Sequence, residues 1–247
     1  MADDVMVTPG GEAGLSQTMR VVDTFIAPSK TFTDILRSSS WWLPFIILVL
    51  ATLGSAYAVD RNVGFTAVAE QQMTKNTMQA DRMASMSADQ RANAVAMSAK
   101  ITRISVYCSF IIILIIVAIE ALILWGIFNF GFGAKTTYGQ VFAVIMYAGL
   151  PRALVALLNV VLLFAGVGLE NYDIQNPVGT NLGYYFTSPV LRAGGAFFDI
   201  FGLWALFLLV IGMAIISRKS KAQSAAVIVG LWVIGLLASM GIAAAFG

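Results

Sequence analysis

Histidine is absent from this 247-residue sequence, and Cys108 is its only cysteine. The lack of histidine excludes histidine-based catalytic triads, histidine zinc motifs and imidazole pH switches. A single cysteine excludes an internal disulfide. The sequence also contains no phosphate-binding glycine loop, nucleophile elbow or dinucleotide-binding fingerprint. It therefore predicts no catalytic, cofactor-binding or metal-binding residues and no enzymatic activity.

Charged residues are scarce as well, at 11% of the chain, whereas 59% of the residues are hydrophobic. Soluble domains have about 25% charged and about 45–50% apolar residues. A soluble globule of this size could not cover so much apolar surface, so lipid must solvate part of it. The net charge of +2 and the scattered basic residues give no indication of nucleic-acid binding, and no small-molecule substrate is indicated. We expect an all-α integral membrane bundle in contact with the lipid bilayer.

The N-terminal forty residues or so are polar or amphipathic, and the first long apolar run begins only at Trp41. No secretory signal peptide is therefore expected. Residues 1–14 are predicted to be a disordered tail. Residues 15–40 are predicted to form an amphipathic segment of two short helices separated at Pro28. Both helices are too short to span a membrane, so we expect either interfacial helices on the cytoplasmic leaflet or a small cytosolic cap packed on the bundle.

The remaining residues, 41–247, are predicted to form a membrane domain with five spanning helices. Each predicted span is a long apolar run bounded by polar, charged or glycine-rich segments. The predicted spans are about 42–59, 104–130, 138–167, 191–217 and 225–246. Pro151 predicts a kink or break in the third span. The loop at about 168–189 is expected to lie at the surface.

A long polar segment, residues 62–103, separates the first two predicted spans. We expect it to be a helical loop outside the bilayer, with a capping box at Ser87 and Gln90. An apolar stripe runs along it at steps of three and four residues. The residues of this stripe that we predict to bind a partner are Met83, Met86, Met97 and Ile101. Such a stripe needs a partner helix, from the same chain or from another subunit.

The distribution of basic residues indicates the orientation of the chain. The N-terminal side and the loops at Lys135 and Arg218 must face the same compartment, and all three carry basic residues. The opposite side is basic only in its long first loop, and long segments translocate largely regardless of charge. We therefore expect a multi-pass protein of the cell membrane, with a cytoplasmic N-terminus and an extracytoplasmic C-terminus.

Three ionisable residues, Glu120, Arg152 and Asp199, fall within the predicted spans. A charge at the centre of a membrane helix costs about 2.5–3.5 kcal/mol, so each needs a partner or a water-filled pocket. At about 1.5 Å per residue, Arg152 and Asp199 lie about 20 Å from the cytoplasmic edge and Glu120 about 15 Å from it. We predict a structural cluster in which the guanidinium group binds both carboxylates. A transport or proton-relay pathway is the alternative.

Four sets of motifs occur in a fixed order along the chain. They are F-x-x-P-x-x-x-F-x-x-I from Phe25 to Ile35 with Trp41-Trp42-x-Pro44, the region from Gly131 to Pro151, the segment from Asn176 to Thr180, and the run from Asp199 to Trp204 with Val210-Ile211-Gly212. In this order and spacing they resemble the Yip-one (Ypt-interacting protein) domain family, in its bacterial form. The resemblance covers most of the chain from about residue 21 onward. The methionine-rich loop 62–103 departs from the family pattern.

This resemblance implies a five-span bundle without catalytic activity. Eukaryotic relatives act in vesicle traffic between the endoplasmic reticulum and the Golgi by contacting Rab-type GTPases, whereas some bacterial relatives look like accessory subunits of ABC-type exporters. The short acidic tail of this chain favours the bacterial setting. We therefore expect a scaffold or accessory subunit that binds other membrane proteins or itself. The alternative is a small transporter or channel that uses Glu120, Arg152 and Asp199, although no inverted repeat is evident.

Overall fold

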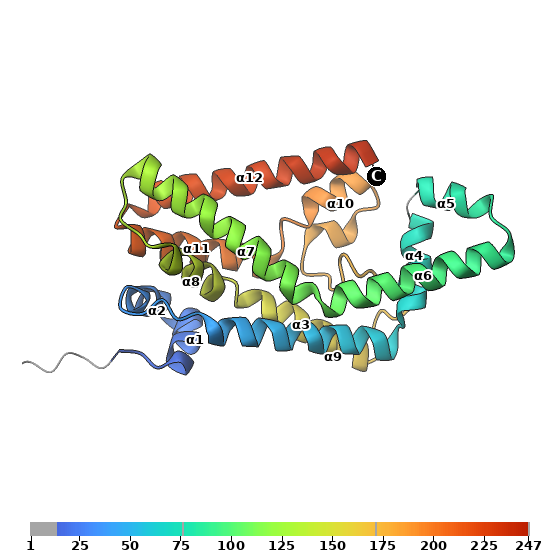
Figure 1. Ribbon diagram of the computed structural model, residues 1–247, viewed down its shortest axis with the longest axis horizontal. Helices are drawn as coiled ribbons and strands as arrows, with labels where there is room; N and C mark the ends of the chain where they lie inside the picture. Colours follow the sequence, from blue (N-terminus) through green and yellow to red (C-terminus); the bar gives the residue numbers. More distant parts are fainter. Residues whose placement is uncertain (1–13, 76, 171, 247) are drawn as a thin grey trace, which may run out of the picture.

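Helices and their connecting loops make up the part of the chain that this computed structural model describes, residues 14–75, 77–170 and 172–246 (Figure 1). The described part contains no β-strand, only an isolated antiparallel backbone bridge between Asn181 and Asp199. The helices are α1 (Gln17–Ile26), α2 (Pro28–Ile35), α3 (Trp42–Asn62), α4 (Phe65–Lys75), α5 (Thr77–Ala84), α6 (Ala88–Tyr107), α7 (Ser109–Gly126), the π-helix η1 (Ile127–Gly131), α8 (Tyr138–Ala148), α9 (Pro151–Phe164), the 3-10 helix η2 (Leu182–Tyr185), α10 (Pro189–Gly195), α11 (Ile200–Ser217) and α12 (Lys221–Phe246). The predicted all-α fold is confirmed.

Five segments among the described residues are long and apolar enough to cross a membrane. They are Trp42–Asn62, Ser109–Gly131, Tyr138–Phe164, Ile200–Ser217 and Lys221–Ala245. The predicted number of spans is therefore confirmed. The third segment is interrupted as predicted, because α8 ends at Ala148 and α9 begins with Pro151. A proline lacks the N–H that a continuous helix would need there, but it fits the first turn of a new one.

The fourth span is shorter than predicted, because residues 191–217 do not form one helix. α10 ends at Gly195, and Asp199 begins a new helix by accepting a hydrogen bond on its Oδ1 from the backbone N–H of Gly202 at 2.7 Å. Such a side-chain cap satisfies a backbone donor that has no partner inside the helix. A Cβ atom on Gly195 would lie 2.5 Å from the backbone nitrogen of Gly183, so the break is also fixed by a close approach of two backbones.

The loop that precedes α10 does not lie at the surface throughout, contrary to prediction. Tyr172, Asn176 and Val178 are buried. The hydroxyl of Thr180 donates a hydrogen bond to Oδ2 of Asp199 at 2.5 Å. The loop thus folds back into the bundle and meets the start of α11, a long-range contact that local composition does not reveal.

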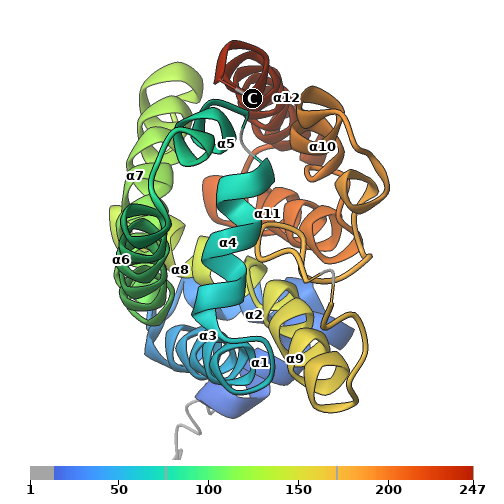
Figure 2. The ribbon, with the colours of Figure 1, turned by 90° about the vertical axis from the view of Figure 1, so that its right-hand side faces the viewer.

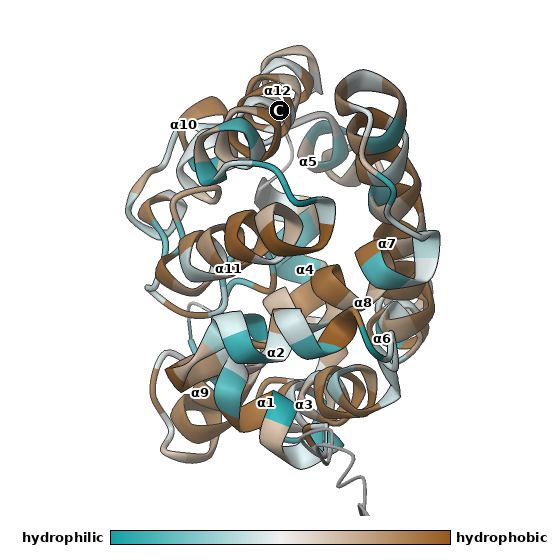
Figure 3. Cartoon of the chain, turned by 90° about the vertical axis from the view of Figure 1, so that its left-hand side faces the viewer, coloured by the Kyte–Doolittle hydropathy of each residue, from teal (hydrophilic) through white to brown (hydrophobic). Residues whose placement is uncertain are grey.

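The core of the bundle is centred on α8, in which every residue from Val141 to Ala148 is buried. α11 packs against α8, and Gly212 leaves the space for this approach. A Cβ atom at Gly212 would lie 2.5 Å from Cγ1 of Val144 and 3.0 Å from the ring of Phe32. Phe32 and Ile35 of α2 are fully buried in the same core. α2 therefore packs into the end of the bundle, beside α8 and α11 (Figure 3).

α1 turns its polar face toward the protein. Arg20 is 0% exposed, and its Nε donates to Oδ2 of Asp34 at 2.6 Å, while Nη1 donates to the carbonyl of Ser38 at 2.8 Å. Met19, Val22 and Ile26 on the other face are exposed. α1 thus has the outward apolar face of an interfacial helix, whereas α2 packs as a cap.

The spans differ greatly in how far the chain covers them. Of the most apolar window in each span, 67% is buried in the α8–α9 span but only 11% in α7 with η1 and 6% in α12. In Figure 1, α12 runs along the top of the molecule, and α7 crosses the molecule diagonally from the upper left. Lipid or a partner must cover their apolar faces, because exposing so much apolar surface to water is unfavourable.

Candidate functional site

A helical arm formed by α4, α5 and α6 extends beyond the spans at the end opposite α1 and α2 (Figures 1 and 2). α6 begins with the predicted capping box: the backbone N–H of Ser87 donates to Oε1 of Gln90 at 3.0 Å, and the N–H of Gln90 donates to Oγ of Ser87 at 3.3 Å. α4 packs against α6. The side chains of this contact are small or β-branched and so allow a close approach; they include Val68, Ala69, Val95 and Ala99.

Polar contacts fix the base of the arm to the first span. The hydroxyl of Tyr107 donates to Oδ2 of Asp60 at 3.2 Å, and Nη2 of Arg103 lies 2.8 Å from the same oxygen. Asp60 lies in the last turn of α3, whereas Arg103 and Tyr107 lie at the end of α6. The arm therefore has a defined direction relative to the spans.

The four residues of the predicted partner-binding stripe do not share one environment on the arm. Met83 and Met86 are half-buried, and Met83 packs against the core of the arm. Met97 and Ile101 are 60% and 57% exposed. These two residues lie on the opposite side of α6 from Ala99, which faces α4. The arm thus uses its small residues for internal packing and leaves the larger Met97 and Ile101 uncovered.

The exposed apolar face of α6 continues into α7. Both helices are joined at Cys108, which is exposed. The exposed large apolar residues along the two helices are Met97, Ile101, Ile104, Ile111, Ile112, Ile115, Ile116, Ile119, Leu122 and Ile123. We call these residues the α6–α7 face. Met97 lies about 18 Å along the helix from Ser109, where the candidate span begins, so the face extends beyond this span.

Asp199 does not join the predicted charge cluster. Its two carboxylate oxygens accept hydrogen bonds from Gly202 and Thr180, and the described residues contain no ion pair between Asp199 and Arg152. The prediction of a three-residue cluster is therefore wrong in respect of Asp199. The physical reason is the break before α11, which turns this residue from the middle of a span into a helix cap.

Glu120 and Arg152 lie close enough for their charges to interact. Glu120 lies on α7 and Arg152 in the first turn of α9, and their charges interact electrostatically. Within the described part of the chain they form no ion pair, and Arg152 is exposed whereas Glu120 is half-buried. The arrangement is a loose pair of opposite charges at the depth of the spans, which can lower the cost of each charge in hydrocarbon.

A polar network around Asn159 of α9 is not predicted by the sequence analysis. Asn159 of α9 is buried, and its Nδ2 donates to Oγ of Ser55 at 2.8 Å and to the hydroxyl oxygen of Tyr172 at 3.1 Å. Arg192 of α10 pairs with Asp173 in the same loop as Tyr172. An asparagine inside an apolar run was the available signal, because buried amides need partners. The loop that supplies one partner could not be placed from the sequence.

A polar opening of about 830 Å³ lies between the arm, this loop, α10 and α12. Its lining consists mainly of neutral amide and hydroxyl side chains, together with the Arg192–Asp173 pair. Three or more acidic, cysteine or histidine ligands do not come together anywhere in the described residues. The opening offers hydrogen bonding to a polar segment or to water.

Comparisons with known proteins give one family. The profile of the Yip1 domain matches residues 22–242, nearly the whole chain. No curated protein and no solved structure matches the chain. The matched region contains all five candidate spans except the last three residues of α12's apolar segment, and it includes the arm. The chain is therefore a member of the Yip1 domain family, a multi-pass membrane protein whose apolar helices fit a role in membrane-associated traffic.

Proposed function

We propose that this protein is a non-enzymatic scaffold or accessory subunit of a membrane transport or trafficking machinery. Its partner is another integral membrane protein that contacts the α6–α7 face both inside and outside the bilayer. For a bacterial cell we propose an ABC-type exporter as that machinery, an assignment that rests on the family resemblance. The membrane is the cell membrane, with the α1–α2 end in the cytoplasm and the arm outside, because the short basic loops lie at the α1–α2 end.

The observation that carries this proposal is the outer part of the α6–α7 face. Lipid can cover the residues of α7, but Met97 and Ile101 lie beyond the span and are exposed. Exposed apolar patches rimmed by polar residues mark interaction sites in folded proteins. The neighbouring Lys100, which is charged and exposed, contributes to such a rim. A partner that spans the membrane can cover both parts of the face at once.

Photo-crosslinking in native membranes tests this contact. We expect a photoreactive amino acid at Met97 or Ile101 to yield a discrete crosslinked product with another membrane protein. The matched control places the same amino acid at Ala96, which is exposed on the same helix but about 100° away from Met97. The product should be at least several-fold weaker there, because Ala96 points away from the α6–α7 face.

The identity of the product decides the proposal. An exporter subunit or another transport component supports it. A product that contains only a second, differently tagged copy of this chain would replace the partner by self-association. Equal labelling from Met97 and Ala96, or no product from either, would refute a specific contact on this face.

A small transporter or channel is the second candidate, and the Glu120–Arg152 pair favours it. The two charges interact electrostatically without an ion pair, and Arg152 is exposed at the depth of a span. A proton relay would need groups of this kind in contact with water.

Charge removal separates the two roles of this pair. If it is structural, Glu120→Leu and Arg152→Leu each leave one charge in hydrocarbon, at about 2.5–3.5 kcal/mol. We expect both single variants to unfold more easily in SDS titrations, and the double variant to recover much of the loss. Proton flux into pyranine-loaded proteoliposomes should stay at the level of protein-free vesicles. A flux that wild-type protein supports and Glu120→Gln abolishes would instead establish the transporter.

A further inference from the structure

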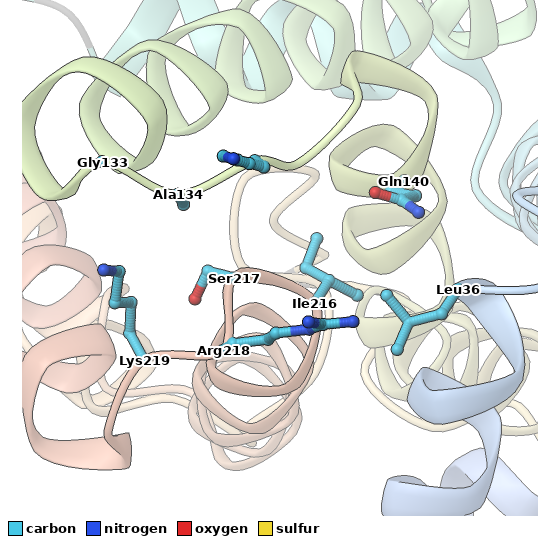
Figure 4. Close-up of a pocket in the computed structure, with 9 residues that line it drawn as sticks. Leu36, Gly133, Ala134, Gln140, Ile216, Ser217, Arg218 and Lys219 are labelled. Atoms are coloured by element: carbon cyan, nitrogen blue, oxygen red, sulfur yellow. The ribbon is translucent and has the colours of Figure 1, made fainter.

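A cavity of about 530 Å³ lies at the α1–α2 end of the bundle, where α2, the loop between η1 and α8, and the turn between α11 and α12 converge (Figure 4). Three basic side chains from two separate loops line it: Lys135, Arg218 and Lys219. Leu36 and Ile216 supply apolar walls. No acidic residue is among those that line the cavity. The cavity is thus a place where positive charge collects beside apolar surface.

The three cations have no counter-ion within the described part of the chain. None of them forms an ion pair or a side-chain hydrogen bond there. Asp34 on the adjacent α2 already binds both Arg20 and Arg37. Like charges that share a cavity repel one another, so an anion bound among them would relieve the repulsion.

The backbone at Arg218 supports a role for its side chain. This residue ends α11 in the left-handed conformation, with φ of 54°, and the next N–H, of Lys219, donates to the carbonyl of Ala214 at 3.2 Å. Helices usually place glycine or asparagine at such a position, because a Cβ atom is unfavourable there. An arginine thus occupies a position that a smaller residue would fill with less strain.

The other polar groups of the cavity divide into donors and acceptors. The hydroxyl of Ser217 donates to the carbonyl of Met213 at 2.5 Å, so its proton is already used. Oε1 of Gln140 accepts from the N–H of Thr137 at 3.0 Å, which leaves the amide NH₂ of Gln140 able to donate. The lining of the cavity therefore supplies three cations and one further donor to an anion. Phosphate oxygens suit this set, since they accept several charge-assisted hydrogen bonds.

The depth of the cavity indicates the source of the phosphate. Its basic residues lie just past Gly131 and Ser217, where two spans end, and just before Lys221, where the last one begins. This is the level of lipid headgroups, and basic pockets between spans at that level suit anionic lipids. Leu36 and Ile216 can cover the glycerol and the first acyl carbons, which a free phosphate ion lacks. We propose that the cavity binds the phosphate of an anionic phospholipid headgroup.

Lipid titration of the full-length protein in mild detergent, read out by native mass spectrometry, tests this site. The probes are dioleoylphosphatidylglycerol, dioleoylphosphatidylcholine and sodium phosphate. The test variant is Lys135→Gln/Arg218→Asn/Lys219→Gln; asparagine tolerates the left-handed conformation, so the turn is retained. The control variant, Arg61→Gln/Arg82→Gln/Lys100→Gln, removes three exposed positive charges, one at the far end of the first span and two on the arm.

A basic residue near an anionic membrane surface contributes about fivefold in affinity, so three contribute about 100-fold. We expect wild-type protein and the control to retain one phosphatidylglycerol that the test variant binds about 100-fold more weakly. Phosphatidylcholine should bind all three proteins equally. Equal losses in the test and control variants would overturn the site in favour of nonspecific charge attraction. Displacement of the lipid by millimolar sodium phosphate would show that the ligand of the cavity is a free phosphate ion and not a lipid headgroup.

Discussion

Replacement of Arg20 by alanine should lower the free energy of unfolding by about 3–5 kcal/mol, the usual cost of breaking a buried ion pair. The guanidinium group is fully buried between α1 and α2, and it donates to Asp34 and to the carbonyl of Ser38. Alanine would leave the carbonyl of Ser38 without this donor and Asp34 with the donors of Arg37 alone. SDS titration in mixed micelles, followed by tryptophan fluorescence, measures the change.

Arg37→Ala is the matched control, because Arg37 binds the same carboxylate from outside. Its side chain is 53% exposed, and its Nε lies 2.8 Å from Oδ1 of Asp34. Hydrogen bonds from Arg37, and then from Arg20, hold the pKa of Asp34 below its ordinary value. Water can replace the exposed guanidinium group but cannot reach the buried one, so Arg37→Ala should change stability far less. Equal losses from both variants would show that burial of Arg20 is not what stabilises the contact between α1 and α2.

Substitution of Gly212 by leucine should cost about 3 kcal/mol or more, because it overpacks the centre of the bundle. The first added atom would already lie 2.5 Å from Val144 and 3.0 Å from Phe32. α11 would have to move away from both α8 and α2. The purified protein is heated and then passed over a size-exclusion column. We expect the variant to elute as aggregate after heating to a temperature well below the one at which wild-type protein aggregates.

Glycine-to-alanine substitutions separate the effect of packing on stability from the effect of helix propensity. Alanine is favoured over glycine by about 1 kcal/mol in helix interiors. At Gly230 of α12 a Cβ atom would meet nothing within 4 Å, so Gly230→Ala should be neutral or stabilising. Gly212→Ala should destabilise despite the same gain in propensity. If both variants behaved alike, the close contact at Gly212 would not control the packing of α11.

The sequence predicted features that depend on neighbouring residues or on total hydrophobicity. The number of spans follows from long apolar runs that only a bilayer can solvate. The break at Pro151 and the capping box at Ser87 and Gln90 follow from backbone hydrogen bonds that these residues remove or supply locally. The family resemblance was also sufficient to identify the Yip1 domain, which the profile match confirms.

The sequence alone therefore determined the all-α membrane bundle, the number of its spans and its family, because hydrophobic transfer and helix capping act over short stretches of chain. Only the tertiary structure decided that Arg20 is buried, that Asp199 caps a helix instead of pairing with Arg152, and that α6 packs through Ala99 and exposes Met97. The burial of Arg20 and the packing of α6 depend on which distant segment arrives at a helix face, and Asp199 is also bound by Thr180 of the preceding loop. That choice is made by shape and by the pairing of buried polar groups, which the order of residues along one helix does not show.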